Sequence, residues 1–468
     1  MSVQVGLLLA YAAALTALGV WIGRRVKGSG GFFVADRKLG ALLLFSTILA
    51  ANIGAGSTVG AAGLGYRDGL AAWWWVGSAG IGTLALAWWV GPRIWRVATQ
   101  QGHLTVGDFL DARYGPSVRG LIAVLLWLGT LAVLAGQLIA MAEIFDVVGG
   151  APRWVGALVG GVVVTAYFAA GGLVSSAWVN LVQLVVLVVG FAVALPWALS
   201  GVGGWAGLVA SAPADAPDYL HFWQGGGSGW IYLALLGPAF IVSPGLVQKV
   251  YGALDERAIK LGLTAAAVAL MLFAFIPPLL GMIAHAHDAG LVRREQALPF
   301  VLTQALPPAL GMMALAAVFS AEVSSADAAL FMLSTSLSKD LYKRFARPDA
   351  SDAEVLKVAR LAATAGGVLG VALAILLPSV ITSLTLFYSL LSVSLFVPVV
   401  AGLHTRRPGV EEALSGIGAG IAALIAVRLA APAGASAWMD PTLIGIVTSA
   451  VVFLLVARFR TTGRRSTA

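Results

Sequence analysis

The sequence has no cysteine and few charged residues. The absence of cysteine excludes a disulfide framework, thiolate metal sites and cysteine nucleophiles. Asp, Glu, Lys and Arg make up 11% of the 468 residues, and 59% of the residues are hydrophobic. Soluble domains carry about a quarter charged residues. So little charge cannot cover a water-facing surface, and the composition predicts an all-α protein whose solvent is the lipid bilayer.

The chain also lacks the patterns of a nucleic-acid-binding protein and of an enzyme. Its net charge of +8 comes from Lys and Arg in short loops between apolar runs. There is no basic face interleaved with exposed aromatics, so no nucleic-acid partner is expected. No His/Glu metal spacing or Ser/His/Asp grouping is present. We therefore predict that the protein is not an enzyme and needs no obligatory protein partner.

Long apolar runs dominate what is present. A helix needs about 20 apolar residues to cross a bilayer core about 30 Å thick. About thirteen such runs occur, at 3–22, 40–65, 70–95, 119–145, 153–170, 177–200, 228–251, 259–285, 300–338, 355–378, 380–403, 412–430 and 441–459. The first run lacks a preceding positive residue and a cleavage site, so we interpret it as a retained helix rather than a signal peptide.

The loop charges predict the orientation. Most of the 29 Lys and Arg residues fall on one side of the alternating runs. The other side holds Arg67, Arg153, Arg293 and Arg294, and Arg428 lies inside a run. By the positive-inside rule, the N-terminus is outside and the C-terminus is cytoplasmic. We predict a multi-pass protein of the bacterial inner membrane.

Two runs contain helix-breaking residues. Gly54 and Gly56 interrupt the second run, and Gly237-Pro238 and Ser243-Pro244-Gly245 interrupt the seventh. Gly and Pro are common in membrane helices, so either run alone also fits ordinary packing. Because the two runs are five helices apart, however, they occupy matching positions in two five-helix units of opposite orientation. Such pairs indicate the central site of a transporter.

This spacing predicts the domain organisation. We expect one transmembrane transporter domain over 1–468 with a 5+5 inverted-repeat core and two broken helices. The repeats cover 40–200 and 228–403, and the helices at 3–22 and 412–459 are peripheral.

The ninth run is rich in hydroxyl groups. Ala321, Ser324 and Ser325 share one helical face. A freed carbonyl and two hydroxyls are hard oxygen ligands for an alkali cation, although Ser and Ala also serve close helix packing. Glu322 and Asp327 are costly in the membrane and indicate ion ligands, proton carriers or half of a structural pair. Arg428 is the obvious intramembrane cation for such a pair, although its run is near an end and its side chain can instead snorkel to the membrane surface.

Several motifs resemble the sodium:solute symporter family, which has a leucine-transporter-type inverted-repeat core. The resemblance covers roughly residues 5 to 455. The motifs that carry it are Ile48–Ile53, Thr105–Leu110 with Arg113 and Tyr114, Gly171-Gly172-Leu173 within Tyr167–Gln183, Gln248-Lys249, Ser324-Ser325, Ser334 and Asp340–Lys343.

The resemblance implies a sodium site and a solute site. The sodium ion, as the coupling ion, would bind the carbonyls of Ala50, Ile53 and Ala321 and the hydroxyls of Ser324 and Ser325. Asn52, Ser57, Trp75, Gln137, Phe240 and Ser243 are the candidates for contact with a small organic solute.

The chain departs from the family at the ion path. Val179 and Asn180 stand where the family often has a Thr-Asp pair, and Asp327 stands near the ion site on the facing helix. We hypothesise that Asp327, Asn180 and Glu322 form a second cation site or ion path. Val76 replaces a Glu of the sugar-carrying members, which disfavours a sugar.

These features predict sodium-coupled symport of a small organic solute into the cell by alternating access. A proton-coupled symporter is the alternative, because Glu322 and Asp327 can titrate. A transporter-like solute sensor is less favoured, because no signalling domain follows Arg460. Amino acids, monocarboxylates and quaternary amines all remain open as solutes.

Overall fold

The protein is a bundle of helices with a single small β-hairpin in its described part. The computed structural model describes residues 3–23, 34–377, 379–405, 409–430 and 439–466. Ten helices in these ranges are long and apolar enough to cross a membrane. Three shorter apolar helices accompany them, at Val5–Leu18, Ala41–Asn52 and Arg153–Ala166. Together they account for the predicted runs and confirm an all-α membrane protein with about 13 transmembrane segments.

The elements follow the predicted order. The first half has α1 (Val3–Gly23), η1 (Ala35–Arg37), α3 (Ala41–Asn52), η2 (Gly56–Gly60), α4 (Ala61–Asp68), η3 (Gly69–Ala72), α5 (Trp73–Ala85), η4 (Leu86–Val90), α6 (Gly91–Gln101), α7 (Val106–Tyr114), α8 (Pro116–Gly149), α9 (Arg153–Gly201) and α10 (Gly204–Ala210). The hairpin of β1 (Gln224–Gly225) and β2 (Ser228–Gly229) follows.

The second half continues in the same way. It contains α11 (Tyr232–Val242), α12 (Pro244–Tyr251), α13 (Glu256–Phe273), α14 (Ile276–His287), η5 (Arg294–Gln296), α15 (Ala297–Gln304), α16 (Pro308–Thr335), η6 (Ser336–Ala346), α17 (Asp352–Leu376), α18 (Val380–His404), α19 (Val410–Ala430) and α20 (Pro441–Ser466).

One predicted boundary differs. The runs at 153–170 and 177–200 both fall in α9, which is 49 residues long. The N-terminal part of α9 lies against α8 and α17, where Gly156 approaches Ala142 and Gly161 approaches Val371. In its C-terminal part, Gly190 approaches Ala317 of α16 and Asn180 contacts Thr47 of α3. The two parts thus have largely different neighbours, although Phe168 also contacts Phe331 of α16. The side chains of 169–177, with the Gly171-Gly172-Leu173 motif, lie outside the described residues.

The two halves of the chain pack on each other reciprocally. The first broken helix lies against the second helix of the other half, because α3 contacts α13 and α4 contacts α14. Conversely, α11 of the second broken helix lies against α5. The long α8 and α16 show the same exchange, since α8 contacts α18 and α16 contacts α9. This exchange is the packing expected of a five-plus-five inverted-repeat core.

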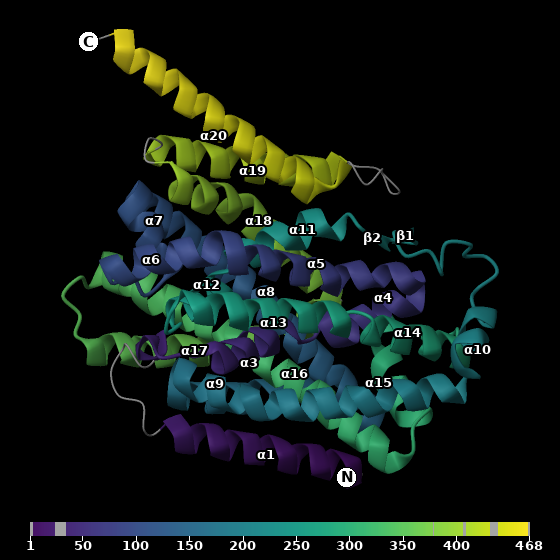
Figure 1. The fold of residues 1–468 in the computed structure, drawn as a ribbon. Coiled ribbons are helices and arrows are strands. Elements are labelled where there is room, and N and C mark those ends of the chain that lie inside the picture. The colour runs from purple at the N-terminus through teal and green to yellow at the C-terminus, as the bar shows by residue number, and fades with distance from the viewer. Residues whose placement is uncertain (1–2, 24–33, 378, 406–408, 431–438, 467–468) are drawn as a thin grey trace.

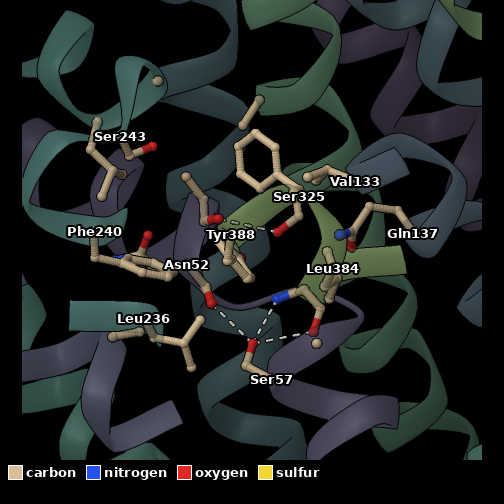
Figure 2. A pocket seen from close by; sticks show the side chains of 18 of the residues that line it. Asn52, Ser57, Val133, Gln137, Leu236, Phe240, Ser243, Ser325, Leu384 and Tyr388 are labelled. Carbon is tan, nitrogen blue, oxygen red and sulfur yellow. Dashed lines mark hydrogen bonds between the residues drawn. The ribbon is translucent and has the colours of Figure 1, made fainter. Parts of the chain in front are cut away.

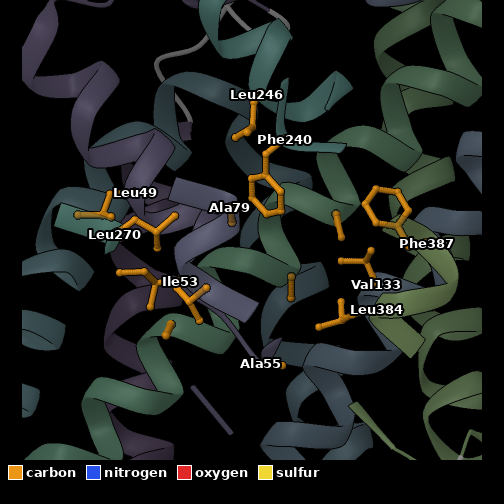
Figure 3. Close-up of a cluster of buried hydrophobic side chains, with 14 of the residues drawn as sticks. Leu49, Ile53, Ala55, Ala79, Val133, Phe240, Leu246, Leu270, Leu384 and Phe387 are labelled. Carbon is orange, nitrogen blue, oxygen red and sulfur yellow. The ribbon is translucent and has the colours of Figure 1, made fainter. Parts of the chain in front are cut away.

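Peripheral helices flank this core on opposite edges. In Figure 1, α1 lies at one edge beside α9, and α19 and α20 lie at the other. Between them, the apolar core closes around the first break. Figure 3 shows Leu49 and Ile53 beside Leu270 of α13, with Val133 and Leu384 on the other side of the break. The break is therefore surrounded by apolar side chains and shielded from lipid and bulk water.

A cluster of charges fixes the end of the bundle that is predicted to be cytoplasmic. Arg119 at the start of α8 forms ion pairs with Asp108 (2.8 Å), Asp111 (3.2 Å) and Asp340 (2.8 Å). Thr105 caps α7 and donates its hydroxyl to Asp340. This cluster joins α7 and α8 to η6, and it contains the Thr105–Leu110 motif.

Candidate functional site

The predicted first break is present. Helix α3 ends at Asn52, and Ile53 has an extended backbone (φ −102°, ψ 103°) before η2 begins at Gly56. Gly54 lies directly against α16, where an added Cβ would overlap Ser325 and approach the Oε1 of Gln137 to 2.7 Å. A residue without a side chain is required here because the side chains of Ser325 and Gln137 lie directly against the Gly54 backbone.

Side chains satisfy the backbone groups that the break frees. The Gly54 amide donates to the Ser57 hydroxyl (2.9 Å), and the Ala55 amide donates to Oε1 of Gln137 (2.7 Å). The Thr58 hydroxyl lies 2.9 Å from the Gly54 carbonyl oxygen. All these atoms are buried. Open backbone in a membrane is tolerated only with such partners, so the local sequence both opens the helix and stabilises the opening.

Oxygen atoms from both sides converge at this break. The Ser324 hydroxyl donates to the carbonyls of Ala50 (3.0 Å) and Ala321 (2.9 Å). The Ser325 hydroxyl contacts the carbonyls of Ile53 (3.1 Å) and Ala50 (3.4 Å). The five residues that the sequence suggested as a sodium site therefore meet, and each is at most 5% exposed. Their neutral, hard oxygen atoms match the preference of alkali cations.

A cavity adjoins this oxygen cluster. It has a water-accessible volume of about 70 Å³, which is room for several water molecules. The six residues suggested for solute contact all line it: Asn52, Ser57, Trp75, Gln137, Phe240 and Ser243. Figure 2 labels all of these except Trp75, together with Leu384 and Tyr388 of α18. The structure thus brings these residues together, and their contact with solute remains a prediction.

Several lining residues escaped the sequence analysis. Leu384, Phe387 and Tyr388 of α18 form one wall, and Val133 of α8 lies beside Gln137. The signal in the sequence is the i, i+3, i+4 spacing of the α18 residues, but many apolar faces in this chain show the same spacing. Lys249 also lines the cavity, although the sequence suggested it only as a motif residue.

The second broken helix is interrupted at Ser243, as predicted, whereas the interruption predicted at Gly237-Pro238 is wrong because both residues lie inside the helix α11. Helix α11 ends at Val242, Ser243 is non-helical (φ −50°, ψ 120°), and α12 begins at Pro244. Within the described residues no side chain caps the first turn of α12. Gly245 and Leu246 of that turn line the cavity. Both breaks therefore reach the same cavity from opposite halves of the chain.

The three residues suggested for a second cation site do not all lie together. Asn180 contacts the Thr47 hydroxyl (3.4 Å), and the Thr47 carbonyl accepts from Nζ of Lys249 (2.9 Å). The charge of Asp327 interacts with that of Lys249, so these residues lie in one neighbourhood. Glu322 lies apart from them, fully buried, with Oε1 hydrogen-bonded to the Thr58 hydroxyl (2.7 Å).

The sequence offered Arg428 either as a buried partner of Glu322 or Asp327 or as a snorkelling residue near a helix end, and its exposure agrees with the second. Arg428 is exposed near the end of α19, a helix that packs on α18 and α20. Lys249 of α12 is the cation whose charge acts on Asp327. Sequence position suggested Arg428 because it lies inside an apolar run, whereas α12, which carries Lys249, packs against α3 and α16. The distance between these residues along the chain hid this pairing.

An inverted-repeat core, two broken helices and a buried central cavity define a class of protein. These features are the architecture of secondary transporters, which bind substrate and coupling ion near the bilayer midplane between discontinuous helices. The protein is a multi-pass membrane transporter of this class.

Comparison with known proteins identifies the family. The model of the sodium:solute symporter family matches residues 32–420, so the chain belongs to this family. It is 27% identical to the sodium/pantothenate symporter of Escherichia coli (strain K12), over 98% of this chain and 97% of the relative. It is 26% identical to high-affinity choline transporter 1 of Drosophila melanogaster, over 84% of this chain and 65% of the relative.

A solved structure confirms the fold. A Na+-coupled sialic acid symporter in a substrate-bound outward-open state superposes with a TM-score of 0.82 at 19% identity, covering 98% of each chain. The homologues are transporters rather than enzymes. The protein is a sodium-coupled symporter of a small organic solute.

Proposed function

We propose that the coupling sodium ion binds the carbonyls of Ala50, Ile53 and Ala321 and the hydroxyls of Ser324 and Ser325. One observation carries this proposal: both hydroxyls of α16 lie within hydrogen-bond distance of carbonyls at the end of α3. The oxygen atoms replace the water shell of the ion, and the hydroxyls then turn their protons away from it. Sodium thereby links the first broken helix to α16.

The solute binds in the adjacent cavity. Ser325 belongs to the proposed ion site and to the cavity wall, and Gly54 and Ser57 of the break also line the cavity. An ion that fixes the break therefore also fixes part of the solute site. Coupling between the two ligands follows from this shared wall, because a ligand shifts a conformational equilibrium by its differential affinity for the two states.

Reciprocal binding tests this function. In proteoliposomes, sodium should tighten solute binding, and solute should tighten sodium binding by the same factor. Pantothenate and choline, the solutes named for two relatives, are the first to try. A solute affinity that stays constant across a sodium titration would reject sodium coupling, whereas sodium-free uptake driven by a pH gradient would favour the proton-coupled alternative.

Asp327 serves, in this proposal, as a guide on the ion path rather than as a solute contact. It lies on α16, two residues beyond Ser325, and it is absent from the cavity wall. Asp327→Asn should weaken sodium activation of uptake more than it changes the order of preferred solutes. Unchanged sodium activation would reject this role.

Uptake into the cell requires the orientation that the loop charges predict. We propose a bacterial inner-membrane location with the N-terminus outside and the C-terminus in the cytoplasm. Because the chain has no cysteine, single cysteines can be labelled without background. An impermeant maleimide should label Ala214→Cys in intact cells, and Asp349→Cys only after the membrane is opened. The reverse pattern would invert the topology.

A further inference from the structure

The cavity wall, where the structure describes it, carries a positive charge without a negative one. Of its described lining residues, Lys249 is the one with a charged side chain, and no Asp or Glu is among them. Lys249 is 2% exposed, and its Nζ donates to the Thr47 carbonyl. Asp327, which is off the cavity wall, offsets the charge of Lys249. Sodium bound nearby would then add a positive charge that nothing on this wall neutralises.

Free backbone donors lie on the same wall as Lys249. In the first turn of α12, the amides of Gly245 and Leu246 have no partner within the helix, and no described side chain caps them. Gly245 and Lys249 are i and i+4, so they lie on one face of α12. Amides at a helix N-terminus bind anions. The helix and the lysine therefore present positive charge and donors together.

The other break differs in this respect, because its donors are occupied. The amides of Gly54 and Ala55 already donate to Ser57 and Gln137. The amide group of Asn52 donates to the Thr83 hydroxyl (3.3 Å). Much of the hydrogen-bonding capacity of these wall residues thus maintains the protein itself. A sugar, with a hydroxyl on nearly every carbon, would find few free partners on this side.

The remaining wall is aromatic and aliphatic. Trp75, Phe240 and Tyr388 lie in contact around the cavity, with ring centroids of Phe240 and Tyr388 5.3 Å apart and of Trp75 and Tyr388 6.3 Å apart. Leu236 and Leu384 extend the same surface. Such a wall suits an apolar solute body. A quaternary amine would gain cation–π contacts here, but it would add a second positive charge beside the sodium ion, and no described lining residue carries a carboxylate to offset that charge.

We propose that the solute is a small organic anion, with a carboxylate bound by the first turn of α12 and Lys249 and an apolar body among Trp75, Phe240 and Tyr388. This inference rests on the proposed sodium and solute sites. The carboxylate accepts hydrogen bonds from the Gly245 and Leu246 amides, and it neutralises the charge that sodium brings.

Matched pairs of solutes test the inference. Purified protein in nanodiscs is heated in sodium chloride or in potassium chloride with each member of a library of pairs that share a body. Pantothenate and pantothenol, gluconate and glucose, betaine and choline, and phenylacetate and phenylacetamide begin the library. We expect sodium-dependent stabilisation from a carboxylate and none from its uncharged or cationic counterpart, with sodium-driven uptake following the same order.

The outcomes separate this inference from the proposed function. If the best sodium-dependent solute lacks a carboxylate, or if no carboxylate responds while sodium alone still stabilises the protein, the anion assignment is rejected and the sodium site stands. If sodium alone gives no stabilisation relative to potassium, the proposed sodium site itself fails.

Variants of Lys249 add a second measurement. Lys249→Met should weaken binding of the preferred carboxylate roughly tenfold to hundredfold and reduce its preference over the matched amide. Lys249→Arg should keep the preference. Lys357→Met, which removes a surface charge from α17, is the control. If Lys249→Met lowers the affinities for acid and amide equally, the lysine has only a structural role and the assignment to Lys249 is wrong.

Discussion

The two broken helices are opened in different ways. The first break, at Ile53–Ala55, is held by side chains from three elements: Ser57 in η2, Gln137 in α8 and Ser325 in α16. The second break, at Ser243, follows from backbone chemistry, because Pro244 cannot donate a hydrogen bond and begins a new helix. No described side chain caps the second helix there.

In the proposed function, this difference corresponds to two tasks. An ion site needs its oxygen atoms at fixed positions, so the first break has a partner for nearly every freed group. A solute site needs unoccupied donors, so the second break leaves its first-turn amides open. The inverted repeat supplies two similar broken helices. The surrounding side chains occupy the backbone donors of the first break and leave those of the second break open. Four variants, each with a measurable outcome, probe this comparison.

The largest effect is expected at the paired hydroxyls. Ser324→Ala with Ser325→Ala removes two of the five proposed sodium ligands. If each lost contact between the ion and a hydroxyl oxygen costs about as much as a hydrogen bond to a charged group, roughly 1.5–3 kcal/mol, sodium affinity should fall about a hundredfold or more. Isothermal titration or sodium-dependent stabilisation measures it. The matched control is Ser338→Ala with Ser394→Ala, because each of these hydroxyls donates to the carbonyl four residues earlier in the chain. This control should leave the sodium affinity unchanged.

Gly54→Ala should stop sodium-driven uptake while the protein still reaches the membrane. The new methyl group would overlap Ser325 and push α16 away from the break, so the oxygen cluster would open. The measurement is sodium-driven solute uptake into proteoliposomes. Gly418→Ala, where nothing lies within 4 Å of the added carbon, should transport normally. Normal uptake by Gly54→Ala would show that the two segments do not meet closely in the working protein.

A moderate effect is expected at Gln137. Gln137→Met leaves the buried Ala55 amide without its acceptor, at a cost of roughly 1–3 kcal/mol, and should weaken sodium binding by roughly tenfold. A buried glutamine on α9 provides the contrast: neither polar atom of the Gln183 side chain has a hydrogen-bond partner among the described residues. Gln183→Met should therefore be neutral or stabilising in thermal unfolding. Equal effects of the two substitutions would contradict the view that the first break is held by Gln137.

The smallest effect is expected at Ser243. Its hydroxyl caps no described backbone group of α12, so Ser243→Ala should leave the melting temperature and the sodium affinity nearly unchanged. Solute affinity should change by no more than several-fold, which a competition uptake assay would resolve. A strong loss of sodium binding would show that the second break also holds the ion, and it would remove the contrast between the two breaks.

Much of the proposed ion site was predictable from the sequence because it depends on local patterns. The spacing of Ala321, Ser324 and Ser325 puts them on one helical face in any helix, and Gly54 beside Asn52 indicates an opened backbone. The roles of the solute-site residues were harder to predict. Gln137 was suggested for the solute, yet its Oε1 accepts the Ala55 amide, and a pattern along α8 cannot indicate which distant amide needs an acceptor.

The distant pairings needed coordinates for the same reason. Lys249 and Asp327 are far apart along the chain, and Arg428 was the simpler candidate because it stood inside an apolar run. Leu384, Phe387 and Tyr388 of α18 line the cavity, but their spacing in the sequence is the same as on many other apolar helix faces, so it could not indicate this role.

By itself, the sequence determined the solvent, the approximate number of membrane segments, the two breaks and the hydroxyl face of α16. Each of these depends on composition or on residues within a few turns of one helix. Only the tertiary structure decided which carbonyls face those hydroxyls, which side chains close the cavity and which cation acts on Asp327. Those contacts join helices that are hundreds of residues apart, and the packing of the two repeats, rather than any local preference, brings them together.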